Sequence, residues 1–140
     1  MNMIAILSKS ILFRNIPESD ISGLLETTAY RVASYRPKDI IALQGTPCNY
    51  LMIVLNGLLQ GQMVNDAGKL VVIEELEAAQ LLAPAFLYAP KNNLPVNIIA
   101  MEPSEILFIH RDDFTVWMQQ NRQLLQNFLM LISGRSHFLS

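Results

Sequence analysis

Residues 39–57 read DIIALQGTPCNYLMIVLNG, and this short span already indicates a β-rich domain. Two apolar runs, 40–43 and 50–55, are rich in β-branched residues and too short for stable helices. Gly45-Thr46-Pro47 separates them and Asn56-Gly57 ends the second, and both groups are typical turn sequences. The span therefore predicts two short strands joined by a tight loop.

The same pattern of short apolar segments separated by turn residues extends from Tyr30 to His110. Short apolar segments recur about every ten residues, which favours an antiparallel barrel or jelly roll over βαβ units. The segment Asn65-Asp66-Ala67-Gly68-Lys69 is the clearest hairpin turn, because Gly68 can adopt a positive φ. The predicted strands are residues 30–35, 39–45, 50–57, 58–64, 69–76, 96–101 and 105–110.

Helical patterns flank this β region on both sides. Residues 1–14 have helical spacing, and a second helix is expected to begin near Pro17, followed by Glu18 and Asp20 in its first turn. Asp112 or Asp113 can cap a helix after the last strand. The sequence thus predicts one α+β domain over residues 1–140, with 1–28 helical, 29–110 a β-barrel and 111–140 helical again.

The composition excludes several classes of protein. Hydrophobic residues make up 51% of the 140 residues and charged residues 16%, which excludes disorder and leaves apolar surface for a partner or ligand. The net charge of −2 does not fit a basic nucleic-acid-binding module. A single cysteine, Cys48, cannot form an internal disulfide and suits a cytoplasmic protein. No apolar run reaches membrane-spanning length, so no membrane association is expected.

The last helical segment carries two adjacent apolar rows at coiled-coil spacing. A helix that packs only on its own domain needs one row, so we expect the second to contact another copy and form a homodimer. The alternative is one wide amphipathic stripe. The stripe still runs at Ser140, which suggests a truncated chain. The predicted dimer contacts are Leu125, Phe128, Leu129, Ile132 and Leu139.

This order of segments resembles the sensor domain of Crp/Fnr-type bacterial transcription regulators. The resemblance rests on LFRNIPESDISGLL at 12–25, the span at 39–57, NDAGKLVVIEEL at 65–76 and the final helix. It implies a cyclic-nucleotide-binding-domain fold, a cytoplasmic dimer and a small-molecule effector. It also implies a helix-turn-helix DNA-binding domain in a longer parent chain, because these 140 residues contain none.

The apolar stretch LLAPAFLYAPKNN, residues 81–93, lies where the resemblance places the ligand pocket. Cyclic-nucleotide-binding relatives have a Gly-Glu pair and a later Arg there, which hold the ribose and the phosphate. Here the pair is replaced by Ala83-Pro84, and the Arg falls near Leu94-Pro95. A cyclic nucleotide is therefore not expected. The predicted pocket residues are Leu81, Leu82, Ala83, Pro84, Phe86, Leu87 and Tyr88.

Two interpretations of this stretch remain open. It is either plain core or an apolar pocket for a flat ligand, of which haem is the leading candidate. The chain resembles the nitrosative-stress regulators of the hybrid-cluster protein, which would make it a sensor of NO. Candidate ligands to a haem iron are His137, then Met63, then Cys48. One cysteine cannot hold an iron–sulfur cluster.

The primary functional hypothesis is an effector-sensing, dimerising regulator domain. Motifs for an enzyme are absent: the sequence has no Gly-rich phosphate loop, no GxSxG and no HExxH. The alternatives are a ligandless protein-interaction module with a degenerate pocket and a divergent cyclic-nucleotide receptor. The sequence does not identify the effector, the DNA site or the sign of regulation.

Overall fold

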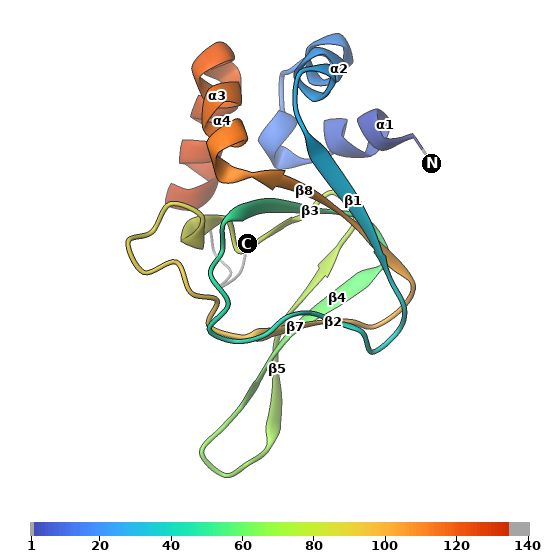
Figure 1. Cartoon of the computed structure of the whole chain (residues 1–140), viewed down its shortest axis with the longest axis vertical. Helices are drawn as coiled ribbons and strands as arrows, with labels where there is room; N and C mark the ends of the chain where they lie inside the picture. Colours follow the sequence, from blue (N-terminus) through green and yellow to red (C-terminus); the bar gives the residue numbers. More distant parts are fainter. Residues whose placement is uncertain (1, 135–140) are drawn as a thin grey trace.

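The computed structural model describes residues 2–134 and contains two four-stranded antiparallel sheets that face each other (Figure 1). The strand orders are β1-β8-β3-β6 and β2-β7-β4-β5. This arrangement confirms the predicted α+β, jelly-roll fold class, although the strands form two layers rather than a closed barrel. The strands are β1 (Tyr30–Tyr35), β2 (Ile40–Ala42), β3 (Tyr50–Asn56), β4 (Leu58–Val64), β5 (Leu70–Glu77), β6 (Leu81–Leu82), β7 (Asn97–Ala100) and β8 (Ser104–His110).

The β4–β5 hairpin projects from the end of the molecule opposite the helices (Figure 1). Its turn is held by the side chain of Asn65, whose Oδ1 accepts from the backbone N–H groups of Ala67 and Lys69 at 3.0 and 2.9 Å. Gly68 has a φ of +78°, the left-handed conformation that this turn requires. The hairpin predicted from Asn65 to Lys69 is therefore present.

The N-terminal helical region contains α1 (Met3–Ser8), the 3₁₀ turn η1 (Ile11–Phe13) and α2 (Glu18–Glu26). The expected continuous helical face over residues 1–14 is interrupted at Ser10. The Ser10 backbone is extended, and its hydroxyl accepts from the N–H of Leu12 at 3.3 Å, which caps a new turn. Serine competes with helix continuation in this way because its hydroxyl bonds nearby backbone groups.

Two helices follow the last strand: α3 (Arg111–Gln120) and α4 (Arg122–Ser133). The N-cap of α3 is His110, not either of the two aspartates, because its Nδ1 accepts from the N–H of Asp112 at 3.1 Å. Trp117 anchors α3 to the N-terminal helical region. Its ring is 1% exposed, packs edge-on against Phe13 and donates an indole hydrogen bond to the Thr28 hydroxyl.

One face of the first sheet packs against the helices, and the opposite face looks toward the second sheet. Side chains alternate between faces along a strand, so Leu51 and Ile53 share the helix-facing side with Leu107 and Ile109, their pairing partners on β8. All four are at most 2% exposed. Met52 faces the other way, into the space between the sheets. No helix within residues 2–134 is both long and apolar enough to cross a membrane.

Candidate functional site

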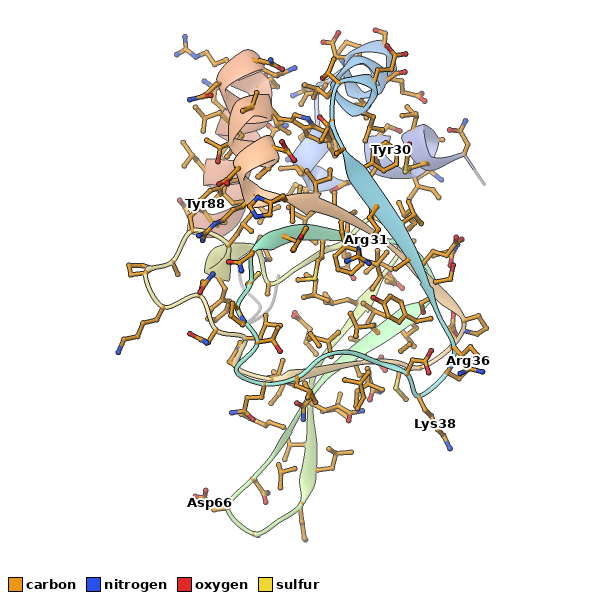
Figure 2. All side chains as sticks on the ribbon, in the orientation of Figure 1. Tyr30, Arg31, Arg36, Lys38, Asp66 and Tyr88 are labelled. Carbon is orange, nitrogen blue, oxygen red and sulfur yellow. The ribbon has the colours of Figure 1, made fainter. Side chains whose placement is uncertain are left out.

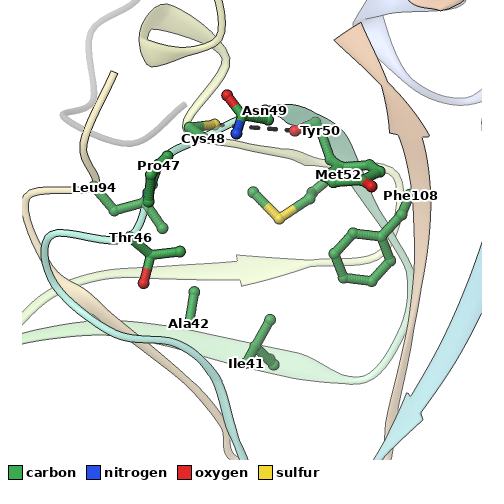
Figure 3. Close-up of a pocket in the computed structure, with 10 residues that line it drawn as sticks. All are labelled: Ile41, Ala42, Thr46, Pro47, Cys48, Asn49, Tyr50, Met52, Leu94 and Phe108. Carbon is green, nitrogen blue, oxygen red and sulfur yellow. Dashed lines mark hydrogen bonds between the residues drawn. The ribbon is translucent and has the colours of Figure 1, made fainter. Parts of the chain in front are cut away.

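A cavity of about 100 Å³ lies between the two sheets, close to the loop that precedes β3 (Figure 3). Residues from both sheets and from two loops contribute to its wall. Thr46, Pro47 and Tyr50 are exposed, so the cavity reaches the surface on their side. Its lining residues are Ile41, Ala42, Thr46, Pro47, Cys48, Asn49, Tyr50, Met52, Leu94 and Phe108.

Backbone hydrogen bonds hold the two lining loops together. Leu94 N–H donates to Thr46 O at 2.9 Å, and Gly45 N–H donates to Leu94 O at 2.8 Å. Cys48 N–H donates to Asn92 O at 2.8 Å. These bonds fix Leu94, which is 2% exposed, as an apolar part of the cavity wall.

The stretch predicted to form the pocket lies beside this cavity and does not line it. Five of the seven predicted residues are buried, and Phe86 is half-buried against the core. Cys48, a lining residue, approaches the stretch: its Sγ lies 4.0 Å from the backbone oxygen of Ala83. The buried residues are Leu81, Leu82, Ala83, Pro84 and Leu87.

Ala83 and Pro84 begin the turn η2 (Pro84–Phe86), which covers this side of the β-roll. Ala83 has a φ of +51°, in the left-handed region that glycine adopts without strain. Pro84 has no N–H group to offer an anion at the start of η2. The turn therefore has the backbone conformation that a glycine would adopt at Ala83. At Pro84, however, it has neither an N–H donor nor a carboxylate.

Arg111 connects the cavity wall to the segment after η2. Its backbone N–H donates to the oxygen of Asn49 at 2.9 Å, and its Nη1 donates to Leu87 O at 3.2 Å. Its own backbone oxygen accepts from the hydroxyl of Tyr88 at 3.1 Å. Arg111, the first residue of α3, is therefore hydrogen-bonded both to the loop before β3 and to the segment after η2.

Tyr88 points away from the cavity, toward the two C-terminal helices (Figure 2). Its side chain is 42% exposed and does not line the cavity between the sheets, although the sequence predicted it as a pocket residue. Its hydroxyl lies 2.8 Å from the Thr115 hydroxyl on α3, and burial raises its pKa. A long aromatic side chain at this turn reaches the neighbouring helix instead of filling the β-roll.

The thiol of Cys48 is buried and neutral. It is 2% exposed, and burial raises its pKa to about 11, although the charge of Arg111 acts in the opposite direction. Met63 is half-buried on β4 and does not line the cavity. His137, the first candidate haem ligand, lies outside the described residues. Within residues 2–134 no group of three or more His, Cys, Asp or Glu residues could hold a metal ion.

Helix α4 buries one of its two apolar rows and exposes the other. Leu124 and Phe128 are at most 2% exposed, whereas Leu125 and Leu129 are 37% and 49% exposed. Phe128 therefore departs from its predicted place in the dimer interface, because it packs inside the domain. Ile132 is half-buried. Leu139 lies outside the described residues.

Asn127, which sequence reasoning did not single out, fixes the orientation of α4. It is 2% exposed, and its Nδ2 donates to Leu12 O at 2.8 Å and to Arg14 O at 2.7 Å. Its Oδ1 accepts from Gln123 at 2.9 Å. An asparagine three residues after Leu124, beside the buried apolar row of the helix, was the available signal for such a contact.

The fold and the cavity agree with a comparison against known families. Residues 32–121 match the family described as cyclic nucleotide-binding domain, which is more than half of the chain. The chain belongs to this family. A transcriptional regulator from Thermotoga maritima has 31% identity to this member, over 81% of this chain and 87% of that one, with a TM-score of 0.73. The resemblance to Crp/Fnr-type regulators seen in the sequence is thereby confirmed.

Two further structures share the fold at lower identity. The sensor domain of the transcriptional regulator DNR from Pseudomonas aeruginosa has 18% identity and a TM-score of 0.78, over 94% of this chain and 86% of that one. The Thermus thermophilus catabolite activator protein has 19% identity and a TM-score of 0.77, over 90% of this chain. The family member described here spans 58% of that Thermus protein. No protein with a curated function matches the chain in sequence.

Proposed function

We propose that this chain is the effector-sensing and dimerisation domain of a Crp/Fnr-type transcription regulator that does not respond to cyclic nucleotides. DNA binding belongs, in this proposal, to a helix-turn-helix domain of the full-length regulator. The chain spans 58% of the Thermus catabolite activator protein, so that protein has room for a further domain. The effector acts by binding one arrangement of the dimer better than the other, since a ligand without such a preference shifts no equilibrium.

The observation that carries the proposal is the apolar replacement of the expected phosphate site. Leu94 is buried in the cavity wall near the position where relatives are expected to carry an arginine. Pro84 stands where they are expected to carry a glutamate. Leu94 supplies no cation, and the Nη1 of Arg111, the cation whose charge acts on Cys48, already donates to Leu87 O. Burying a phosphate without a matched cation costs several kcal/mol. Binding in the usual family manner is therefore strongly disfavoured.

Haem does not fit the described residues. Ligand pockets of ordinary size measure about 300–1,000 Å³, and this cavity measures about 100 Å³. Cys48 holds its proton up to a pKa of about 11, so it is a poor thiolate ligand. Met63 does not line the cavity. An NO response through haem therefore needs a site other than the one that these side chains form.

Dimerisation through α4 is supported by the exposure of Leu125 and Leu129. These two side chains are 37% and 49% exposed and lie four residues apart, on one face of the helix. Apolar side chains grouped on one helix face are typical of helix–helix interfaces. The ring contact between Tyr88 and Phe128 places the segment after η2 beside α4. A structural change at the cavity can therefore be transmitted to the proposed dimer interface through this contact.

The test is a pair of titrations of the purified protein. Calorimetry with cAMP and with cGMP is expected to give no saturable heat, and binding tighter than micromolar would contradict the proposal. A haem titration followed by Soret absorption is expected to show no stoichiometric change. If it does show one, His137→Ala and Met63→Ala identify whether either residue holds the iron.

A ligandless interaction module is the second candidate, and the small cavity volume favours it. In that case the same α4 contacts assemble two copies, and no effector changes their affinity. The two functions differ in one measurement: the dimer dissociation constant responds to a cavity ligand only if the domain is a sensor.

A further inference from the structure

We infer that the effector class for the cavity between the sheets is a small uncharged molecule, mostly apolar, with one hydrogen-bond acceptor. This inference rests on the proposed sensor function and names the ligand chemistry of that site. The side chains that line the cavity determine this class.

The lining carries no formal charge. None of the ten lining residues is Asp, Glu, Lys, Arg or His. The Cys48 thiol keeps its proton at neutral pH. An ion placed against Met52, Leu94 and Ile41 would lose its water without gaining a counter-ion, which costs several kcal/mol or more. Arg111 is close enough for its charge to act on Cys48, but it does not line the cavity and its Nη1 already donates to Leu87 O. The cavity therefore selects against both anions and cations.

Arg31 lies next to the lining and does not alter this conclusion. Its guanidinium carbon lies 4.1 Å from the centroid of the Phe108 ring, in a cation–π contact. Arg31 is exposed and does not itself line the cavity. The guanidinium is therefore already held against an aromatic face at the edge of the site, and the test below includes an anion to measure its influence.

The volume sets an upper limit on ligand size. An apolar cavity of about 150 Å³ accommodates benzene, with its six carbon atoms. The present cavity of about 100 Å³ accordingly holds ~4–5 non-hydrogen atoms without rearrangement. Six of its ten lining residues are apolar: Ile41, Ala42, Pro47, Met52, Leu94 and Phe108. Most of the ligand surface must therefore be apolar.

Two side chains in the lining provide hydrogen-bond donors. The amide of Asn49 is oriented by Asn92, whose Nδ2 donates to Asn49 Oδ1 at 2.9 Å. This bond leaves the Nδ2 of Asn49 as a donor. Within residues 2–134 neither that Nδ2 nor the hydroxyl of Tyr50 has a hydrogen-bond partner. A ligand carbonyl or hydroxyl oxygen would accept from either group, which gives the acceptor in the proposed class.

A chain of contacts links the cavity wall to helices α3 and α4. Asn49 accepts from the backbone N–H of Arg111, and Arg111 holds Leu87 and Tyr88. Tyr88 packs against Phe128 on α4. A ligand that shifts Asn49 would therefore shift the first residue of α3 and the contact with α4 together.

The experiment compares three probes with the same number of non-hydrogen atoms and different charge: 1-butanol, propionate and butylammonium. Each is titrated into the dimeric protein while backbone amide shifts of residues 41–52 are followed by NMR. A second reading is the alkylation rate of Cys48, the single cysteine of the chain. We expect saturable shifts and slower alkylation with butanol and at least tenfold weaker binding of the two ions.

Variants separate this site from non-specific binding. Ala42→Leu fills the cavity and is expected to abolish the butanol response, and Ala42→Val is the milder version if the larger side chain impairs folding. Val72→Leu is the control, because Val72 is 50% exposed on β5 and lies away from the lining. It should leave the response unchanged.

The outcomes distinguish this inference from the proposed function. Equal binding of propionate or butylammonium would overturn the uncharged ligand class. Failure of all three probes, or a response unaffected by both Ala42 variants, would overturn the site. In either case a dimer that ignores cAMP and cGMP would still support the regulator proposal, which is tested by calorimetry and sedimentation.

Discussion

The ring of Tyr88 packs edge-on against that of Phe128, with 5.8 Å between centroids and 82° between planes. Phe128 packs in turn against Phe114, at 5.1 Å and 79°. These contacts join the turn over the β-roll to both C-terminal helices. Edge-to-face aromatic pairs contribute about 0.5–1.5 kcal/mol each beyond their buried area. The turn and α4 are therefore coupled by an energy large enough to measure.

Replacing Tyr88 separates the contribution of its hydroxyl from that of its ring. Tyr88→Phe removes the hydrogen bonds to Arg111 and Thr115 and should lower the free energy of unfolding by about 0.5–1.5 kcal/mol. Tyr88→Ala also removes the ring contact and should weaken dimerisation as well. Urea denaturation and sedimentation measure the two effects. Tyr30→Phe is the control, since Tyr30 is similarly exposed at 43%, and it should change stability by less than about 0.5 kcal/mol.

Charged residues on the exposed row of α4 should produce a monomer. In Leu125→Glu/Leu129→Glu two carboxylates would be buried in the seam without partners, which costs more than a helix–helix contact provides. Because both side chains point outward, circular dichroism should stay unchanged. Sedimentation velocity gives the mass of the particle.

The control for that variant is Leu70→Glu/Val72→Glu on the β4–β5 hairpin. Leu70 and Val72 are 61% and 50% exposed, so they are apolar like the α4 pair and at least as exposed. This variant should remain dimeric. A dimer that survives the Leu125/Leu129 change would place the interface elsewhere.

The strand pattern was predictable because alternation and turn residues are local properties. Segments 30–35 and 58–64 match β1 and β4 at both ends. The strand β6 was missed because two residues, Leu81 and Leu82, are too few to show a period. The cap by His110 was missed because aspartate is the commoner capping residue and an imidazole nitrogen gives no clear signal.

The site was less predictable than the fold. Residues 81–88 are apolar and stand where the family pocket is expected, but apolarity does not distinguish core from lining. The actual lining combines residues from 41 to 108, and only the packing of the two sheets brings Met52 and Phe108 beside Ala42. Of the residues predicted from the sequence, only Cys48, a candidate iron ligand, lines the cavity.

Gly57 should tolerate no side chain. It lies between β3 and β4 with a φ of +97°, and a Cβ there would approach the Ser104 side chain and backbone within 2.1–2.6 Å. Gly57→Ala must therefore shift the start of β8 and strain the turn, and a loss of several kcal/mol of unfolding free energy is expected. Thermal denaturation checks this.

Gly23→Ala is the matched control for Gly57. Gly23 lies within α2, and a Cβ there meets nothing within 4 Å. Alanine is favoured over glycine inside a helix by about 0.5–1 kcal/mol, so this variant should be more stable than the wild type. Equal stability of the two variants would contradict the proposed clash with Ser104.

Stability at alkaline pH should depend on the Cys48 thiol. Burial raises its pKa from 9.0 to about 11, so the folded state binds the proton more tightly than the unfolded state. The stabilisation is complete below pH 9, where both states are protonated. It is lost as the pH rises through 11, because the unfolded thiol has ionised first. Two pKa units correspond to roughly 2–3 kcal/mol, the largest loss that the thiol can cause.

Tyrosines and lysines also titrate in this range, so the comparison must be made against Cys48→Ala. The free energy of unfolding, measured in urea from pH 8 to pH 11, should fall more steeply in the wild type than in the variant. The cavity that alanine leaves lowers stability by the same amount at every pH, and therefore does not change the slope. Two results would show that the thiol is not held in an apolar environment. One is an unfolding free energy that falls equally with pH in the wild type and in Cys48→Ala. The other is alkylation of Cys48 that reaches half its maximal rate near pH 9. Either result would weaken the argument that the cavity beside it excludes charge.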